Sequence, residues 1–180
     1  MIVLDFSASM YETNEDIDKM TLSAKDLIDS LNETHQVGVV EFHRPDEPPA
    51  LLHAFTTYKN AAKEAIDNFS YGKIYRDFSS CWDAVHKGLK QFPEKPDPNV
   101  FKTLAFLSDG FDNSSFNTPD DVIALAKERD VHIYALGIGS GKEEKVLETI
   151  ALETGGTYVH SENINVLRER FKQIIKDIKG

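Results

Sequence analysis

The chain has 180 residues, 41% of them hydrophobic, which suits one domain with an ordinary buried core. Its formal net charge of −10 disfavours nucleic acid as a partner and leaves cations or basic protein surfaces. The single cysteine, Cys81, excludes an internal disulfide and a zinc site built on two or four cysteines. No signal peptide is evident and no apolar run approaches the ~20 residues of a membrane helix, so we expect no membrane insertion by this segment.

Periodic hydrophobic residues predict alternating strands and helices. A short buried strand is expected over residues 1–5, a helix with one apolar face over 14–31, and a second strand over 36–42. The connection to the next strand, 50–55, is too short for a crossover helix, so this strand should return antiparallel at a sheet edge. The later elements are expected to be helices at 58–69 and 80–92, a strand at 101–107, a helix from 118, a strand at 131–138, a helix at 143–153, a strand at 156–160 and a helix at 166–178.

This order specifies an α/β fold, a doubly wound, mostly parallel six-stranded sheet with one antiparallel edge strand and helices on both faces. The helix from residue 118 has local start signals, with Thr118 as N-cap and Pro119 in the first turn. Because the first strand follows Met1 at once and the last helix reaches the final residues, we expect one domain over 1–180, cut from a longer protein. Whether that protein is cytoplasmic, secreted or at the cell surface stays open.

Oxygen-bearing side chains follow the ends of two predicted strands. The first strand ends in Asp5, with Ser7 and Ser9 at alternate positions behind it, and the strand at 101–107 is followed by Asp109. Carboxylate and hydroxyl oxygens suit a hard cation such as Mg²⁺ or Mn²⁺. The first motif alone is also typical of a helix cap. Two such strand ends, at the edge where doubly wound sheets bind ligands, indicate a metal site.

Three motifs in chain order resemble a known site. They are Asp5-Phe6-Ser7-Ala8-Ser9, Ser79 four residues before Asp83-Ala84-Val85, and Leu107-Ser108-Asp109-Gly110-Phe111-Asp112. Together they are similar to the metal-ion-dependent adhesion site (MIDAS) of von Willebrand factor A-type domains, which include the integrin inserted domains. The likeness extends from Met1 to about Ile178, and residues 131–139 and 151–158 are similar to the family's fifth and sixth strand regions.

The resemblance implies a ligand set. In that family two serines and a threonine bind the cation, two aspartates bind it directly or through water, and a carboxylate of the partner protein often completes the shell. Carried over by position, the implied metal ligands are Asp5, Ser7, Ser9, Ser79 and Asp109. The implied ion is Mg²⁺ or Mn²⁺, with Ca²⁺ as the alternative.

Two positions depart from the family pattern. Serine stands at position 79 where the family has threonine, which keeps the hydroxyl and loses the methyl group that restrains χ1. Ser80 and Asp77 remain alternative ligands from the same loop. Ala8 stands where the family has glycine between the two serines, a change that should leave coordination intact.

The resemblance also implies a binding surface around the metal. Aromatic residues and arginine are favoured at interface centres. We expect the loops at this end of the sheet to contact a partner through Tyr11, Tyr75, Arg76, Phe78 and Phe111. Phe116 belongs to the same loops, as does Trp82, whose place at a helix start favours burial. The final helix should pack on the sheet through a stripe of Val166, Phe171, Ile174, Ile175 and Ile178, and as in integrin-type relatives it is a candidate for a movable element.

The expected function is therefore a non-enzymatic, metal-dependent protein-binding module for adhesion or assembly. One alternative is an Mg²⁺-dependent phosphohydrolase of the haloacid-dehalogenase type, with Asp5 as the nucleophile. That chemistry wants a second aspartate two residues later, where this chain has Ser7, which cannot protonate a leaving group at neutral pH. A further alternative is a scaffold subunit in which the metal only stabilises the loops.

Overall fold

A computed structural model describes residues 1–7, 10, 14–43, 47–70, 79–109, 112–137, 143–160, and residues 166, 169, 172, 173 and 176. The strands are β1 (Ile2–Asp5), β2 (Val37–Phe42), β3 (Ala50–Thr56), β4 (Lys102–Ser108), β5 (Val131–Gly137) and β6 (Tyr158–His160). The helices with continuous described bounds are α1 (Asn14–Ser30), α2 (Lys59–Ser70), α3 (Cys81–Leu89), α4 (Pro119–Arg129) and α5 (Glu144–Glu153). Within these described ranges, no helix is both long and apolar enough to span a bilayer.

The six strands form one sheet in the order β3-β2-β1-β4-β5-β6. All neighbouring pairs run parallel except β2 and β3, which run antiparallel, so the predicted doubly wound sheet with one antiparallel edge strand is confirmed. The connection after β2 has no room for a crossover helix, which is why β3 turns back beside it. The switch in chain direction across the sheet falls between β1 and β4, where such folds bind ligands.

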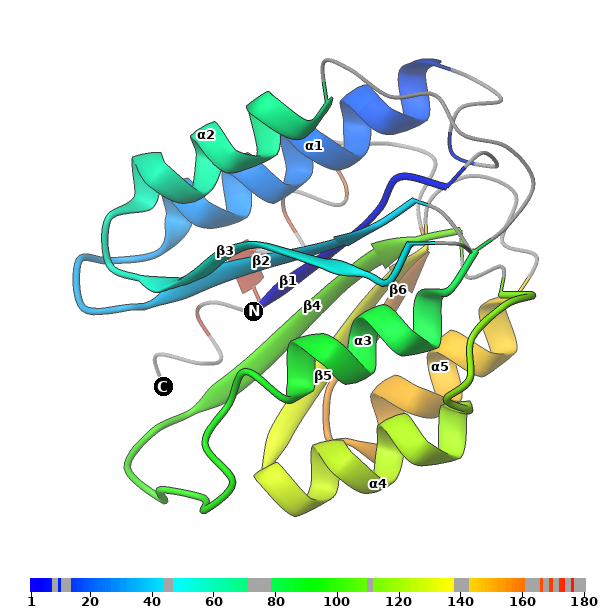
Figure 1. Cartoon of the computed structure of the whole chain (residues 1–180). Helices are drawn as coiled ribbons and strands as arrows, with labels where there is room; N and C mark the ends of the chain where they lie inside the picture. Colours follow the sequence, from blue (N-terminus) through cyan, green and yellow to red (C-terminus); the bar gives the residue numbers. More distant parts are fainter. Residues whose placement is uncertain are drawn as a thin grey trace.

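Helices cover both faces of the sheet, as Figure 1 shows: α1 and α2 lie over one face, and α3, α4 and α5 over the other. Alternate residues of β1 point to opposite sides, so Ile2 and Leu4 belong to the core under α1, while Val3 belongs to the core under α3. Every residue of β1 and β2 is buried, as expected of central parallel strands. Because both faces of the sheet are covered by these two cores, a site is expected at the ends of the strands.

Local sequence signals account for the start and end of α4. Thr118 accepts a hydrogen bond from Asp121 N, and the Asp121 carboxylate accepts one from Thr118 N, so the predicted N-cap is a reciprocal capping box. Pro119 occupies the first turn. The helix ends at Asp130, whose φ of 55° places it in the left-handed region.

The final segment corrects one expectation about packing. The described residues at 166, 169, 172, 173 and 176 are helical, and all five are exposed. Val166 is 44% exposed, so it does not join the predicted apolar stripe on the sheet. Helical spacing explains this, because residue 166 shares its side of the helix with Glu169 and Gln173, three and seven positions later. The other predicted stripe residues, Phe171, Ile174, Ile175 and Ile178, lie outside the described residues.

Candidate metal centre at the carboxyl end of the sheet

Asp5, the last residue of β1, carries a fully buried carboxylate that is held in place by two donors. Its Oδ1 accepts a hydrogen bond from Ser7 N at 2.9 Å, and its Oδ2 accepts one from Ser108 Oγ at 2.5 Å. Ser108 ends the neighbouring strand β4, so the second bond joins two strand ends. Each carboxylate oxygen has further lone pairs, so these bonds orient the group and leave it able to bind a cation.

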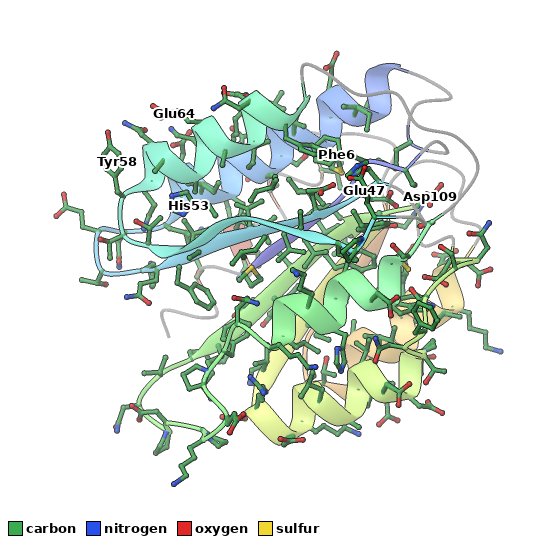
Figure 2. All side chains as sticks on the ribbon, viewed as in Figure 1. Phe6, Glu47, His53, Tyr58, Glu64 and Asp109 are labelled. Atoms are coloured by element: carbon green, nitrogen blue, oxygen red, sulfur yellow. The ribbon has the colours of Figure 1, made fainter. Side chains whose placement is uncertain are left out.

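Asp109 follows β4 directly and is also buried. Figure 2 shows it at the same end of the sheet as Phe6, which follows Asp5. The pKa of the Asp5 carboxyl is raised to about 7: burial is the largest cause, the nearby charge of Asp109 adds to it, and hydrogen bonds from Ser108 and Ser7 oppose it. Two buried carboxylates that repel each other at adjacent strand ends are stabilised by a cation between them.

Serine hydroxyls supply neutral oxygens at this end of the sheet. Ser7 is buried, and the Ser79 side chain is only 2% exposed. Among the described residues, Ser79 Oγ has no hydrogen-bond partner, and neither has the buried Ser80 Oγ. A buried hydroxyl without a partner costs about 1–3 kcal/mol, so an oxygen of this kind fits a metal ligand. Ser80 precedes α3 without capping it through its side chain, so both serines remain candidates for the loop ligand.

The backbone of Ser79 is clamped by the loop that follows Asp109. Ser79 N donates to Asn113 Oδ1 at 2.9 Å, and Asn113 N donates back to the Ser79 carbonyl at 3.1 Å. The Ser79 carbonyl also accepts from Ser114 N and, at 2.8 Å, from Ser114 Oγ. The loop with the second aspartate therefore sets the position of the loop with the candidate hydroxyl ligand.

Two more aspartates tie this loop to the start of α3. The Asp112 carboxylate accepts from Trp82 N at 3.2 Å and from Ser115 Oγ at 2.5 Å. The Asp83 carboxylate accepts from Phe116 N, at 3.0 Å from its nearer oxygen, and from Asn117 N at 2.8 Å. Sequence reasoning assigned no task to Asp83, Asp112 or Asn113. The sequence signal that could have identified these residues is an aspartate or asparagine close to a helix start, because such side chains bond to free backbone N–H groups.

The only cysteine lies beneath the site. Cys81 is fully buried, and burial, together with the charges of Asp112 and Asp5, raises the pKa of its thiol well above the usual range. Without a metal, the thiol therefore stays protonated at neutral pH and is a poor nucleophile. Trp82 is buried as expected and packs on Phe106, with 6.2 Å between the ring centroids.

A buried histidine and a buried glutamate, His43 and Glu41, contact each other at the end of β2. His43 Nδ1 is 2.7 Å from Glu41 Oε2, and His43 Nε2 is 3.4 Å from Glu47 Oε2. The ring also packs against Phe69 at 5.3 Å between centroids. Because two carboxylates contact its two ring nitrogens, His43 has a structural role.

The structure thus brings four of the five predicted ligands to one end of the sheet: Asp5, Ser7, Ser79 and Asp109. Ser9 and the alternative ligand Asp77 lie outside the described residues, as do the predicted contact residues Tyr11, Tyr75, Arg76, Phe78 and Phe111. The part of the chain that the structure describes contains no cluster of three or more His, Cys, Asp or Glu side chains able to hold a metal. A centre here would therefore depend on hydroxyl oxygens beside the two carboxylates.

A family profile described as von Willebrand factor type A domain matches residues 1–173. No curated protein sequence is similar enough to match the chain. The conserved hypothetical protein BatB from Bacteroides thetaiotaomicron has a similar crystal structure, with a TM-score of 0.80, 19% identity, and coverage of 99% of this chain and 97% of that one.

Two further structures of similar fold contain a metal according to their descriptions. Proximal thread matrix protein 1 from the mussel byssus, with a zinc-occupied MIDAS motif, has a TM-score of 0.75 and 21% identity, over 97% of this chain and 46% of that one. The manganese-loaded TRAP protein of Plasmodium vivax has a TM-score of 0.66 and 20% identity, over 95% of this chain and 71% of that one. At these identities the likeness shows a shared fold.

Proposed function

Because the chain belongs to the von Willebrand factor type A domain family, we propose that it is a non-enzymatic module that binds a protein partner through a divalent cation. The proposed ligands share a position just beyond strand ends or in the loop before α3, and they are Asp5, Ser7, Ser9, Ser79 and Asp109. The ion is Mg²⁺ or Mn²⁺, with Ca²⁺ as the alternative. The role is adhesion or assembly.

The observation that carries this proposal is the pairing of two buried carboxylates with a buried hydroxyl that no described atom satisfies. Asp5 and Asp109 repel each other, and Ser79 Oγ is without a partner among the described residues. A hard dication relieves both unfavourable features at once. The two related structures with zinc and manganese support the choice of a divalent ion.

Hydrogen bonds within the protein would hold the proposed ligands in position before the ion binds. Ser108 and the backbone of Ser7 orient the Asp5 carboxylate, and Asn113 holds the loop that carries Ser79. When bound, the ion supplies a Lewis-acidic position for an oxygen of the partner. Its charge is offset by only two carboxylates, and the other ligands are neutral hydroxyls. The preferred partner group is therefore a carboxylate, from an aspartate or glutamate of a protein.

Metal binding is tested by calorimetric titration of the metal-free domain with Mg²⁺ and Mn²⁺, for the wild type and for Asp109→Ala. We expect saturable one-site binding by the wild type and its loss in the variant. Partner binding is tested with short peptides that carry a central aspartate, against the same peptides with asparagine, in Mn²⁺ and in EDTA. Binding that requires both the aspartate and the ion supports the proposal, whereas equal binding in EDTA favours the scaffold alternative.

The phosphohydrolase alternative requires an acidic residue two positions after Asp5. Ser7 occupies the position where that chemistry needs an acidic group, and it is buried beside the Asp5 carboxylate. A serine hydroxyl does not serve as a general acid at neutral pH. We expect no Mg²⁺-dependent hydrolysis of a small phosphate ester above the level of an Asp5→Asn variant.

A further inference from the structure

Phe116 is an extreme case of an exposed aromatic residue. Its side chain is 96% exposed, whereas the next most exposed large hydrophobic side chains in the described part of the chain, Leu152 and Tyr58, are 65% and 63% exposed. Single exposed apolar residues are common on protein surfaces, so exposure alone indicates no function. What distinguishes Phe116 is the way its backbone is held and where the loop lies.

The backbone at Phe116 is fixed by a charged acceptor. Phe116 N lies 3.0 and 3.1 Å from the two oxygens of the Asp83 carboxylate, and Asn117 donates to the same group through its backbone N at 2.8 Å and its side-chain Nδ2 at 2.6 Å. Hydrogen bonds to an ionised group are stronger than neutral ones. Asp83 belongs to the first turn of α3, so the backbone of Phe116 is held against a helix while its side chain faces solvent.

The rest of the loop is tied down on the side that faces the candidate metal centre. Asp83 N donates to Ser115 Oγ at 3.1 Å, and Asn113 and Ser114 bond to the Ser79 backbone. Between Asp109, a proposed ligand, and Phe116, the described residues 112–115 all bond to the start of α3 or to Ser79 before it. Figure 1 shows residues 112–118 at the end of the molecule where β1 and β4 finish.

We propose that Phe116 is an apolar contact of the partner-binding surface, which packs against apolar side chains beside the partner carboxylate that reaches the metal. This proposal rests on the metal-dependent binding proposed above and specifies its partner. The partner segment is acidic at one point and has apolar side chains beside that point. A backbone that is already fixed loses little conformational entropy on binding, and aromatic residues dominate interface energies.

The experiment uses a displayed library of short peptides with a fixed central aspartate and randomised flanks. Peptides are selected on the wild-type domain in Mn²⁺ and then measured by titration against Phe116→Ala and against Leu152→Ala, a matched truncation of an exposed apolar residue on α5. We expect apolar residues to be enriched beside the aspartate. Affinity should fall about tenfold or more for Phe116→Ala and stay within about twofold for Leu152→Ala.

Metal titration of the same variants separates the two proposals. Mn²⁺ affinity should be equal in the wild type, Phe116→Ala and Leu152→Ala, because neither side chain is a proposed ligand. Peptides that bind in a Mn²⁺-dependent manner, but equally well to Phe116→Ala, would overturn the role of Phe116 and leave metal-dependent binding standing. A library that yields no Mn²⁺-dependent peptide would overturn the proposed function, and the role of Phe116 with it.

Discussion

Ser108 Oγ donates a hydrogen bond to Asp5 Oδ2, and this bond joins the last residue of β4 to the last residue of β1. Because β1 and β4 are parallel neighbours, their carboxyl ends meet, and the bond orients a carboxylate at that meeting point. It also opposes the rise in the pKa of Asp5 that burial causes. Ser108 is therefore predicted to matter for metal binding without being a ligand.

Replacing Ser108 with alanine should weaken Mn²⁺ binding and shift its pH dependence. Without the hydroxyl donor, the pKa of Asp5 rises further, so the proton competes with the ion up to a higher pH. We expect a loss of about 1 kcal/mol in the free energy of unfolding for the lost bond. Calorimetric titration over a pH series checks the shift. Ser30→Ala, which removes the hydroxyl that bonds to Leu27 O at the end of α1, should leave the pH dependence unchanged.

The metal-free domain should lose stability as the pH rises from about 4 to about 7. Burial raises the pKa of Asp5 to about 7, above the value of ~4 in an unfolded chain. A raised carboxyl pKa contributes stability that is complete below the unfolded value and is lost as the pH rises through the folded value. The Tm without metal should therefore fall between about pH 4 and about pH 7 and level off above that, and the gain in Tm from Mn²⁺ should grow over the same window. An Asp5→Asn variant with the same pH profile as the wild type would contradict this assignment.

Adding the ion should stabilise the folded domain by mass action. At 100 times its dissociation constant, a ligand specific to the folded state adds about 2.7 kcal/mol to the free energy of unfolding. Asp109→Ala should abolish this gain, because it removes one of the two carboxylates at the strand ends. Chemical denaturation with and without Mn²⁺ measures it. Glu128→Ala, at an exposed position of α4, is the control and should keep the full gain.

The two candidate hydroxyls can be separated by paired variants. Ser79→Ala should reduce Mn²⁺ affinity by about tenfold or more if Ser79 supplies the loop ligand, whereas Ser80→Ala should have little effect. The reverse result would transfer the role to Ser80. Ser79→Thr keeps the oxygen and adds the methyl group that restrains χ1, so we expect it to retain or improve affinity.

Asn113 should act on the metal through the loop that it clamps. Asn113→Ala removes the acceptor for Ser79 N and should weaken Mn²⁺ binding several-fold without removing a ligand. Asn99→Ala is the matched control, since Asn99 also bonds within an exposed loop, to Asp97, in the connection before β4. A Tm loss without any change in Mn²⁺ affinity would show that the clamp serves the fold alone.

Short-range patterns in the sequence determined most of the fold. Alternating strand and helix periodicity indicated the doubly wound sheet, the short connection before Ala50 required the antiparallel edge strand, and Thr118 with Pro119 marked the start of α4. These features depend on residues close together in the chain, where backbone geometry restricts the choices. The placement of Asp5 and Asp109 beyond neighbouring strand ends followed from the same topology.

Only the tertiary structure decided how the site is held. The Asn113 to Ser79 bond spans 34 residues and the Ser108 to Asp5 bond spans 103, and nothing in a single sequence pairs polar side chains over such distances. Folding brings them together because burial of the apolar strands sets the neighbours of every strand end. The same holds for the position of Phe116, because its backbone N–H donates to Asp83 on a distant helix. Periodicity specifies which faces are buried, whereas the contacts between distant loops are set by the packed sheet.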